Sequence, residues 1–67
     1  MDPKYPHIAV QISGEDGNVF SILGRVTGAM RRAQVPQAEI SAFTDELMAS
    51  ESYGDALRCV MRHVQAA

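Results

Sequence analysis

Hydrophobic and polar residues alternate strictly over residues 7–13 of the chain. Ile8, Val10 and Ile12 fall on one face of an extended backbone, and polar or small side chains fall on the other. This alternation predicts a half-buried β-strand near the N-terminus. Prolines at two positions within residues 1–6 predict a flexible lead-in before that strand.

Apolar spacings of three and four residues follow the strand and predict three helices, over residues 19–33, 36–49 and 53–65. Asn18 and Ser52 carry side chains that suit the N-caps of the first and third helices. The apolar stripes of these helices predict the core positions Val19, Ile22, Leu23, Val26, Ala29, Met30, Ala33, Ile40, Phe43, Thr44, Leu47, Tyr53, Ala56, Leu57, Val60, Met61 and Val64.

The predicted fold class is α+β and mainly α, with one N-terminal strand and three helices in a compact single domain over residues 7–67. An isolated strand is not stable in water, so the strand needs a partner. The tail at residues 64–67 is one candidate, and the same strand of a second copy is the other. We favour the second copy, because Val64 continues the apolar stripe of the third helix. This choice predicts a two-fold homodimer through the strand edge.

Phe20, Gly24 and Gly28 lie on a flank of the first helix away from its apolar stripe, with Arg25 beside them. A glycine inside a helix costs about 1 kcal/mol relative to alanine, so we expect another backbone to approach this flank. Interior glycines usually serve packing, which favours the chain's own strand or another helix as that neighbour. A partner subunit or a ligand is the alternative. The candidate interaction surface comprises Phe20, Gly24, Gly28 and Arg25 on the helix, with Ile8, Val10 and Ile12 on the strand.

Length, charge and cysteine content limit the functional classes. The 67 residues suffice for one small domain, and a net charge of −2 gives no electrostatic reason to expect nucleic acid or an anionic membrane as partner. The single cysteine, Cys59, cannot form an intramolecular disulfide, which fits a reducing cytoplasm. No stretch has the apolar length of a membrane span. We therefore expect a soluble cytoplasmic protein with no membrane association.

The SGEDGNVFSILGRV run over residues 13–26 resembles the SGEDGN-x-F-x-ILGRV motif of small uncharacterised proteins encoded by bacteria and bacteriophages. The resemblance covers most of residues 8–64 and includes the later positions Met30, Arg31, Arg32, Ala33, Tyr53, Leu57, Val60, Met61 and Arg62. Where that group has a Trp-Val pair near the end of the third helix, this chain has His63 and Val64. The resemblance implies a bacterial or phage origin and no assigned activity.

The turn at residues 14–18 joins a strand to a helix N-terminus, as phosphate-binding loops do. It lacks the lysine of a Walker loop, and Glu15 and Asp16 would repel phosphate. The spacing of these two carboxylates also matches no calcium loop. We expect a structural turn that caps the first helix.

Cys59 and His63 lie four residues apart on one helix flank and can offer two metal ligands, with His7 as a distant third. Structural zinc takes four ligands, so a buried or half-buried cysteine and a surface histidine explain the pair more simply. Asp55 shares this flank, but an ordinary solvated helix face produces such runs by chance. We expect no metal site, no cofactor site and no catalytic residues, and hence no enzyme.

Residues 30–40 have the outline of a helix-turn-helix. Gln34 stands where that turn usually needs glycine, and the second helix carries Glu39, Asp45 and Glu46 but no lysine or arginine. Acidic side chains would meet nucleic-acid phosphates with the wrong charge. The sequence therefore predicts a non-catalytic, self-associating interaction module with an unknown protein partner, and a small nucleic-acid-binding regulator is the alternative.

Overall fold

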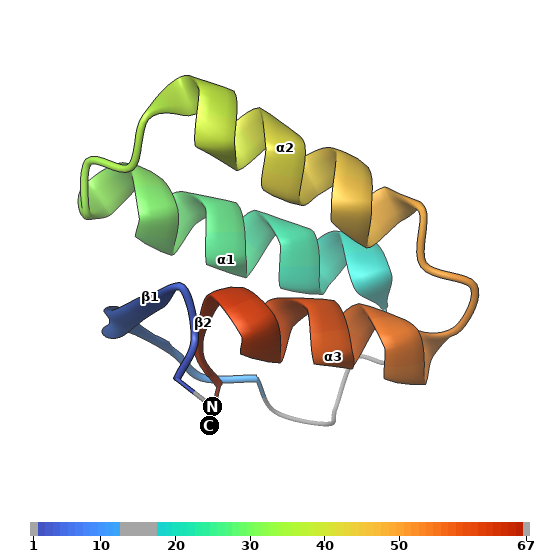
Figure 1. Cartoon of the computed structure of the whole chain (residues 1–67). Helices are drawn as coiled ribbons and strands as arrows, with labels where there is room; N and C mark the ends of the chain where they lie inside the picture. Colours follow the sequence, from blue (N-terminus) through green and yellow to red (C-terminus); the bar gives the residue numbers. More distant parts are fainter. Residues whose placement is uncertain (1, 13–17, 67) are drawn as a thin grey trace.

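The computed structural model describes residues 2–12 and 18–66 of the chain. The elements follow in the order β1 (Tyr5–Val10), α1 (Val19–Arg32), α2 (Gln37–Met48), α3 (Tyr53–His63) and β2 (Val64–Ala66). The helices pack side by side, with α1 between α2 and α3 in the view of Figure 1, and the small sheet covers one end of α3. The predicted α+β, mainly α domain is confirmed.

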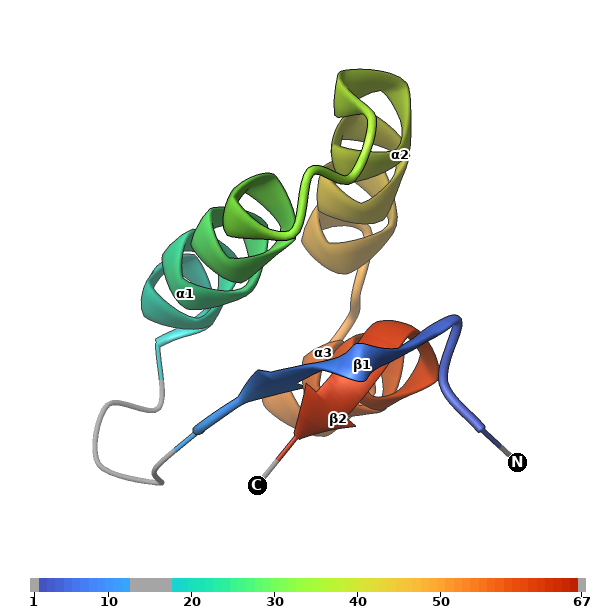
Figure 2. The ribbon, with the colours of Figure 1, turned by 90° about the vertical axis from the view of Figure 1, so that its left-hand side faces the viewer.

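The N-terminal strand finds its partner within the chain. β1 pairs with β2 in parallel, with Tyr5 opposite Val64, Ala9 opposite Gln65 and Val10 opposite Ala66. Figure 2 shows the two strands side by side in front of α3. The favoured prediction, in which a second copy supplies the partner strand, is therefore wrong, and the predicted alternative of a pairing tail is correct.

Val64 explains why the tail is free to pair. The third helix ends at His63, two residues before its predicted end, and Val64 is extended, with φ of −135° and ψ of 166°. Its side chain remains in the core, where the residue is 1% exposed. Val64 thus continues the apolar stripe of α3 and also begins a strand, since a change of backbone conformation at one residue need not move its side chain out of the core.

The strand begins within the predicted lead-in and ends earlier than predicted. β1 includes residues 5 and 6, and the Lys4 amide before it donates to the carbonyl of Arg62 at 2.9 Å. The strand register shifts between Tyr5 and Ala9, an interval that contains Pro6. Proline has no amide hydrogen to donate to a partner strand, which accounts for an irregularity there.

The core lies where α1, α2, α3 and the sheet meet. Its buried apolar residues are Ile8, Val10, Ile22, Val26, Ala29, Met30, Ile40, Phe43, Leu47, Ala56, Cys59, Val60 and Val64. Two predicted core positions are wrong, since Met61 is 54% exposed and Ala33 is also exposed. On α3 the buried stripe follows Ala56, Cys59 and Val60, so Met61 lies one helical step of 100° beyond it.

Both predicted N-caps are confirmed. The Asn18 side chain accepts the Phe20 amide at 2.9 Å, and the Ser52 hydroxyl accepts the Asp55 amide at 3.1 Å. These bonds satisfy amides that have no partner within the first turn of a helix.

Gln34, between α1 and α2, occupies the left-handed backbone region, with φ of 64°. That region costs a residue with a Cβ about 1–2 kcal/mol, and glycine avoids this cost while losing more chain entropy on folding. We therefore expect Gln34→Gly to raise the free energy of unfolding by about 0.5–1 kcal/mol in chemical denaturation. Ala33→Gly is the matched control, because Ala33 has φ of −87° and glycine relieves nothing there. Equal stability changes in the two variants would contradict the prediction.

Candidate functional site

The outer side of α1 carries an apolar side chain next to exposed backbone. Phe20 is 67% exposed, and a Cβ added at Gly24 would meet no atom within 4 Å. At Gly28 the nearest atom is Nη1 of Arg32, 3.6 Å away. The expectation that the chain's own strand or another helix rests on these glycines is therefore wrong for the part of the chain that the structure describes.

Arg25 connects this side of α1 to the strand. Its Nη1 donates to the Gln11 carbonyl at 3.3 Å, just beyond the end of β1. A shallow hollow lies beside this contact, between the strand and the helix, and is lined by Ala9, Val10, Gln11, Gly24, Arg25, Ala29 and Arg32. The helix part of the candidate surface thus continues into a depression along β1.

The strand residues of the candidate surface are largely buried, although Val10 borders the hollow beside Gly24 and Arg25. Ile8 and Val10 are 4% and 6% exposed and belong to the core, while Ile12 is half-buried and packs against it. Because their side chains already make apolar contacts within the chain, they offer little surface to a partner. The structure separates the predicted surface into a buried strand part and an exposed helix part.

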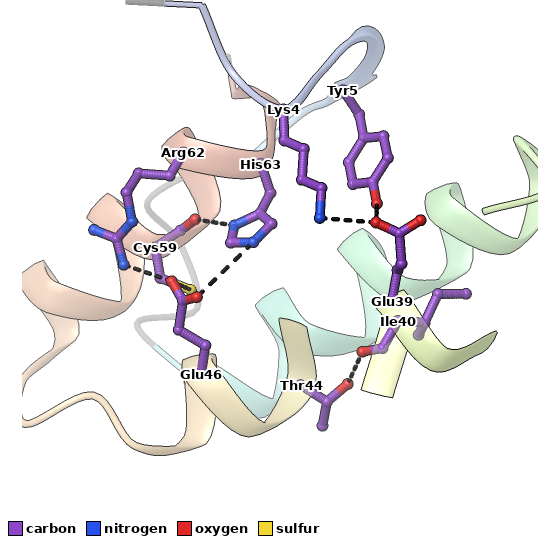
Figure 3. Close-up of polar contacts among 9 residues, drawn as sticks. All are labelled: Lys4, Tyr5, Glu39, Ile40, Thr44, Glu46, Cys59, Arg62 and His63. Atoms are coloured by element: carbon purple, nitrogen blue, oxygen red, sulfur yellow. Dashed lines mark hydrogen bonds and ion pairs between the residues drawn. The ribbon is translucent and has the colours of Figure 1, made fainter. Parts of the chain in front are cut away.

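A second group of side chains gathers where α2 faces α3 (Figure 3). The Cys59 thiol donates to Oε2 of Glu46 at 3.3 Å, and Nη2 of Arg62 donates to the same oxygen at 2.6 Å. Nε2 of His63 lies 4.0 Å from the other carboxylate oxygen, Oε1. The ring atom Nδ1 of His63 lies 2.8 Å from the Cys59 carbonyl oxygen one turn earlier.

These contacts move two pKa values in opposite directions. The hydrogen bond from Arg62, with that from Cys59, lowers the pKa of Glu46. Burial of the thiol, followed by its bond to the carboxylate, raises the pKa of Cys59 to about 12. Cys59 is therefore a protonated thiol at neutral pH, whereas cysteine nucleophiles act as thiolates.

A third polar group joins the N-terminal segment to the start of α2. Tyr5 donates its hydroxyl to Oε1 of Glu39 at 2.6 Å, and Nζ of Lys4 lies 2.7 Å from the same oxygen (Figure 3). Hydrogen bonds from Lys4 and Tyr5 lower the pKa of Glu39. Basic side chains thus form solvent-exposed ion pairs with acidic side chains of α2. Each exposed pair of this kind contributes little stability.

The geometry gives little support to a helix-turn-helix. In Figure 1, α1 and α2 run side by side in opposite directions, whereas the two helices of that motif cross at about 90–120°. Asp45 and Glu46 are exposed on the would-be recognition helix. The other predicted loop feature, the acidic turn, falls largely on residues 13–17, which lie outside the described residues.

Sequence spacing identified Cys59 and His63 but not their neighbour. Glu46 lies 13 residues before Cys59 on another helix, and no periodicity links positions on two separate helices. His7, the predicted third member, does not belong to the group formed by Glu46, Cys59 and His63. His63 was predicted at the surface, yet its side chain is only 13% exposed.

No family model, curated protein or solved structure matches the chain. The resemblance to small bacterial and bacteriophage proteins therefore stays a prediction. Within the described part of the chain, no helix has the length and apolar character needed to cross a membrane.

Proposed function

We propose that this protein is a non-catalytic interaction module that self-associates through the glycine flank, defined as Phe20, Gly24 and Gly28 of α1. The observation that carries the proposal is a phenylalanine, 67% exposed, one helical turn before a glycine whose Cβ position has no neighbour within 4 Å. The exposed Phe20 side chain protrudes from the helix, and the glycine, which has no side chain, leaves a recess one turn away. Such a surface can bind a second copy of itself.

The spacing of the glycine flank is self-complementary. Phe20 lies one turn before Gly24 and Gly28 one turn after it, so each is about 6 Å from Gly24 along the helix axis. A two-fold axis through Gly24 makes two α1 helices antiparallel and places Phe20 over Gly28 of the partner subunit. Small residues at the crossing point allow close approach of two helix backbones. One surface therefore satisfies both halves of an isologous interface.

We also propose that the protein is cytoplasmic, and separate observations support this compartment and the absence of catalysis. Cys59, the only thiol of the chain, has a pKa raised to about 12 by burial, so it is not an activated nucleophile at neutral pH. A chain with one cysteine forms no internal disulfide, which suits a reducing compartment. The nucleic-acid-binding alternative has weaker support, because the exposed carboxylates of α2 would repel phosphate.

Sedimentation velocity over a range of protein concentrations tests the proposal. Interfaces centred on one helix pair are small, so we expect a dimer with a dissociation constant in the micromolar range. Phe20→Ser removes an apolar contact worth about 1.5–3 kcal/mol, twice per dimer, and is expected to weaken association at least about 100-fold. Gly28→Leu is expected to block it by filling the recess. Met61→Ser is the matched control, since Met61 is also exposed, at 54%, but lies on α3.

Circular dichroism separates loss of association from loss of folding. Leucine favours a helix over glycine, and Gly28 has space around its Cβ position, so Gly28→Leu should remain folded. An unfolded Gly28→Leu variant would mean that the glycine serves internal packing. A wild-type chain that stays monomeric at several hundred micromolar, or binds duplex DNA with a steep salt dependence, would overturn the proposal in favour of another function.

A further inference from the structure

We propose that Glu46, Cys59 and His63 form a binding site for a zinc-class divalent cation that joins α2 to α3. One ligand atom from each residue is available, and the three atoms lie within 4.8 Å of one another. Thiolate, imidazole and carboxylate are the three protein ligands that zinc takes, and a water molecule would complete four-coordination. This inference does not depend on the glycine flank, which lies on α1.

One of the distances matches the spacing of a tetrahedral site, and the others are somewhat longer. Zinc bonds of about 2.3 Å to sulfur and about 2.0–2.2 Å to nitrogen or oxygen place neighbouring ligand atoms about 3.3–3.6 Å apart. Sγ of Cys59 and Oε2 of Glu46 are 3.3 Å apart, and Nε2 of His63 is 4.0 Å from Oε1 of Glu46. The two distances run to different oxygens of Glu46, an exposed residue whose side chain would rotate to bring one oxygen toward both partners.

His63 is oriented for metal binding by its neighbours. A carbonyl oxygen can only accept a hydrogen bond, so the 2.8 Å contact with the Cys59 carbonyl places the ring proton of neutral His63 on Nδ1. The lone pair is then on Nε2, the atom nearest the Glu46 carboxylate. The Phe43 ring meets the imidazole edge-on, with centroids 4.9 Å apart, and fixes its plane. In most metal-binding histidines, the ring nitrogen that does not bind the metal donates its hydrogen to a neighbouring oxygen in this way and so orients the ring.

Charge also suits a divalent cation. Binding releases the Cys59 thiol proton to solvent, and the resulting thiolate with the Glu46 carboxylate balances two positive charges. The cation takes the place of the hydrogen between Sγ and Oε2. Arg62, which donates to Oε2, has a side chain that is 60% exposed and can swing into solvent.

Co²⁺ titration of the full chain, followed by absorbance, tests the site. We expect one Co²⁺ per chain, visible bands of tetrahedral cobalt, and a near-ultraviolet band from sulfur-to-cobalt charge transfer that Zn²⁺ abolishes by competition. The charge-transfer band reports Cys59 alone, because the chain has no other cysteine. Loss of a direct ligand in Glu46→Gln should weaken Co²⁺ binding by more than about 100-fold, beyond the usual effect of changing an outer partner.

Asp45→Asn is the matched control, because it neutralises the adjacent exposed carboxylate on the same helix. Glu46→Gln alters an exposed side chain, so folding is retained, whereas Cys59→Ser changes a buried one. Thermal melting is a second test that does not depend on the cobalt absorbance. Zn²⁺ should raise the melting temperature of the wild type and of Asp45→Asn, but not that of Glu46→Gln. Absence of the charge-transfer band, equal binding by Glu46→Gln and wild type, or one metal shared by two chains would overturn the proposal.

Discussion

Phe43→Ala is expected to remove about 3–5 kcal/mol from the free energy of unfolding, the cost typical of deleting a buried aromatic ring. Phe43 is 1% exposed and is the largest fully buried side chain among residues 2–12 and 18–66. At roughly 0.05–0.15 kcal/mol per residue, a domain of 67 residues has only about 3–10 kcal/mol to lose. If the domain's stability lies at the low end of that range, a large fraction of the variant should be unfolded in water. Urea denaturation followed by circular dichroism measures both the stability and the unfolded fraction.

Phe20→Ala is the matched control, because it deletes the same ring from the only other phenylalanine of the chain. Phe20 is 67% exposed, so its removal should change the stability of the monomer by less than about 0.5 kcal/mol. The same variant should lose self-association if the glycine flank is an interface. A Phe43→Ala variant as stable as Phe20→Ala would mean that the Phe43 ring does not belong to the core.

Local pattern predicted the helices well because their signals are local. The start of α1 at Val19 and of α3 at Tyr53 was predicted from the residues that cap them, and both caps are present. Apolar spacing predicted Ile40, Phe43, Thr44 and Leu47 as the stripe of α2; Ile40, Phe43 and Leu47 are buried, and Thr44 is half-buried. Capping and periodicity each act within a few residues, so the sequence alone contains them.

Contacts between distant parts of the chain were not predictable in the same way. β2 has three residues, too few to show an alternation, and Val64 satisfies the helical and the extended pattern equally. The polar group on α2 and α3 depends on Glu46, whose place beside Cys59 follows from helix packing. For the glycine flank, periodicity correctly placed the residues away from the apolar stripe of α1. It could not show whether another backbone contacts the glycines, because an open glycine and a closely packed one look alike in sequence.

Deletion of residues 64–67 is expected to abolish the native fold at room temperature. Burial of the Val64 side chain is worth about 1.5–3 kcal/mol, and the residue is 1% exposed in the intact chain. The deletion also removes the strand that pairs with β1, and a strand without a partner is not stable in water. A two-dimensional ¹H–¹⁵N spectrum should change from dispersed to collapsed, and the urea transition should shift to lower concentration or disappear. Gln65→Ala is the control, since Gln65 is exposed in β2 and its backbone pairing survives.

The concentration dependence of this result distinguishes pairing within the chain from pairing between copies. If β1 pairs with β2 of its own chain, dilution of the intact protein leaves the β1 amide signals and their slow hydrogen exchange unchanged, even below the concentration at which α1 contacts form. The same dilution should alter signals of Phe20, Gly24 and Gly28, because those residues lie in the proposed contact between copies. A truncated chain that keeps a dispersed spectrum only at high concentration would show that a second β1 can replace β2. Strand pairing and self-association would then be one process, whereas the parallel pairing of Tyr5 with Val64 predicts two independent ones.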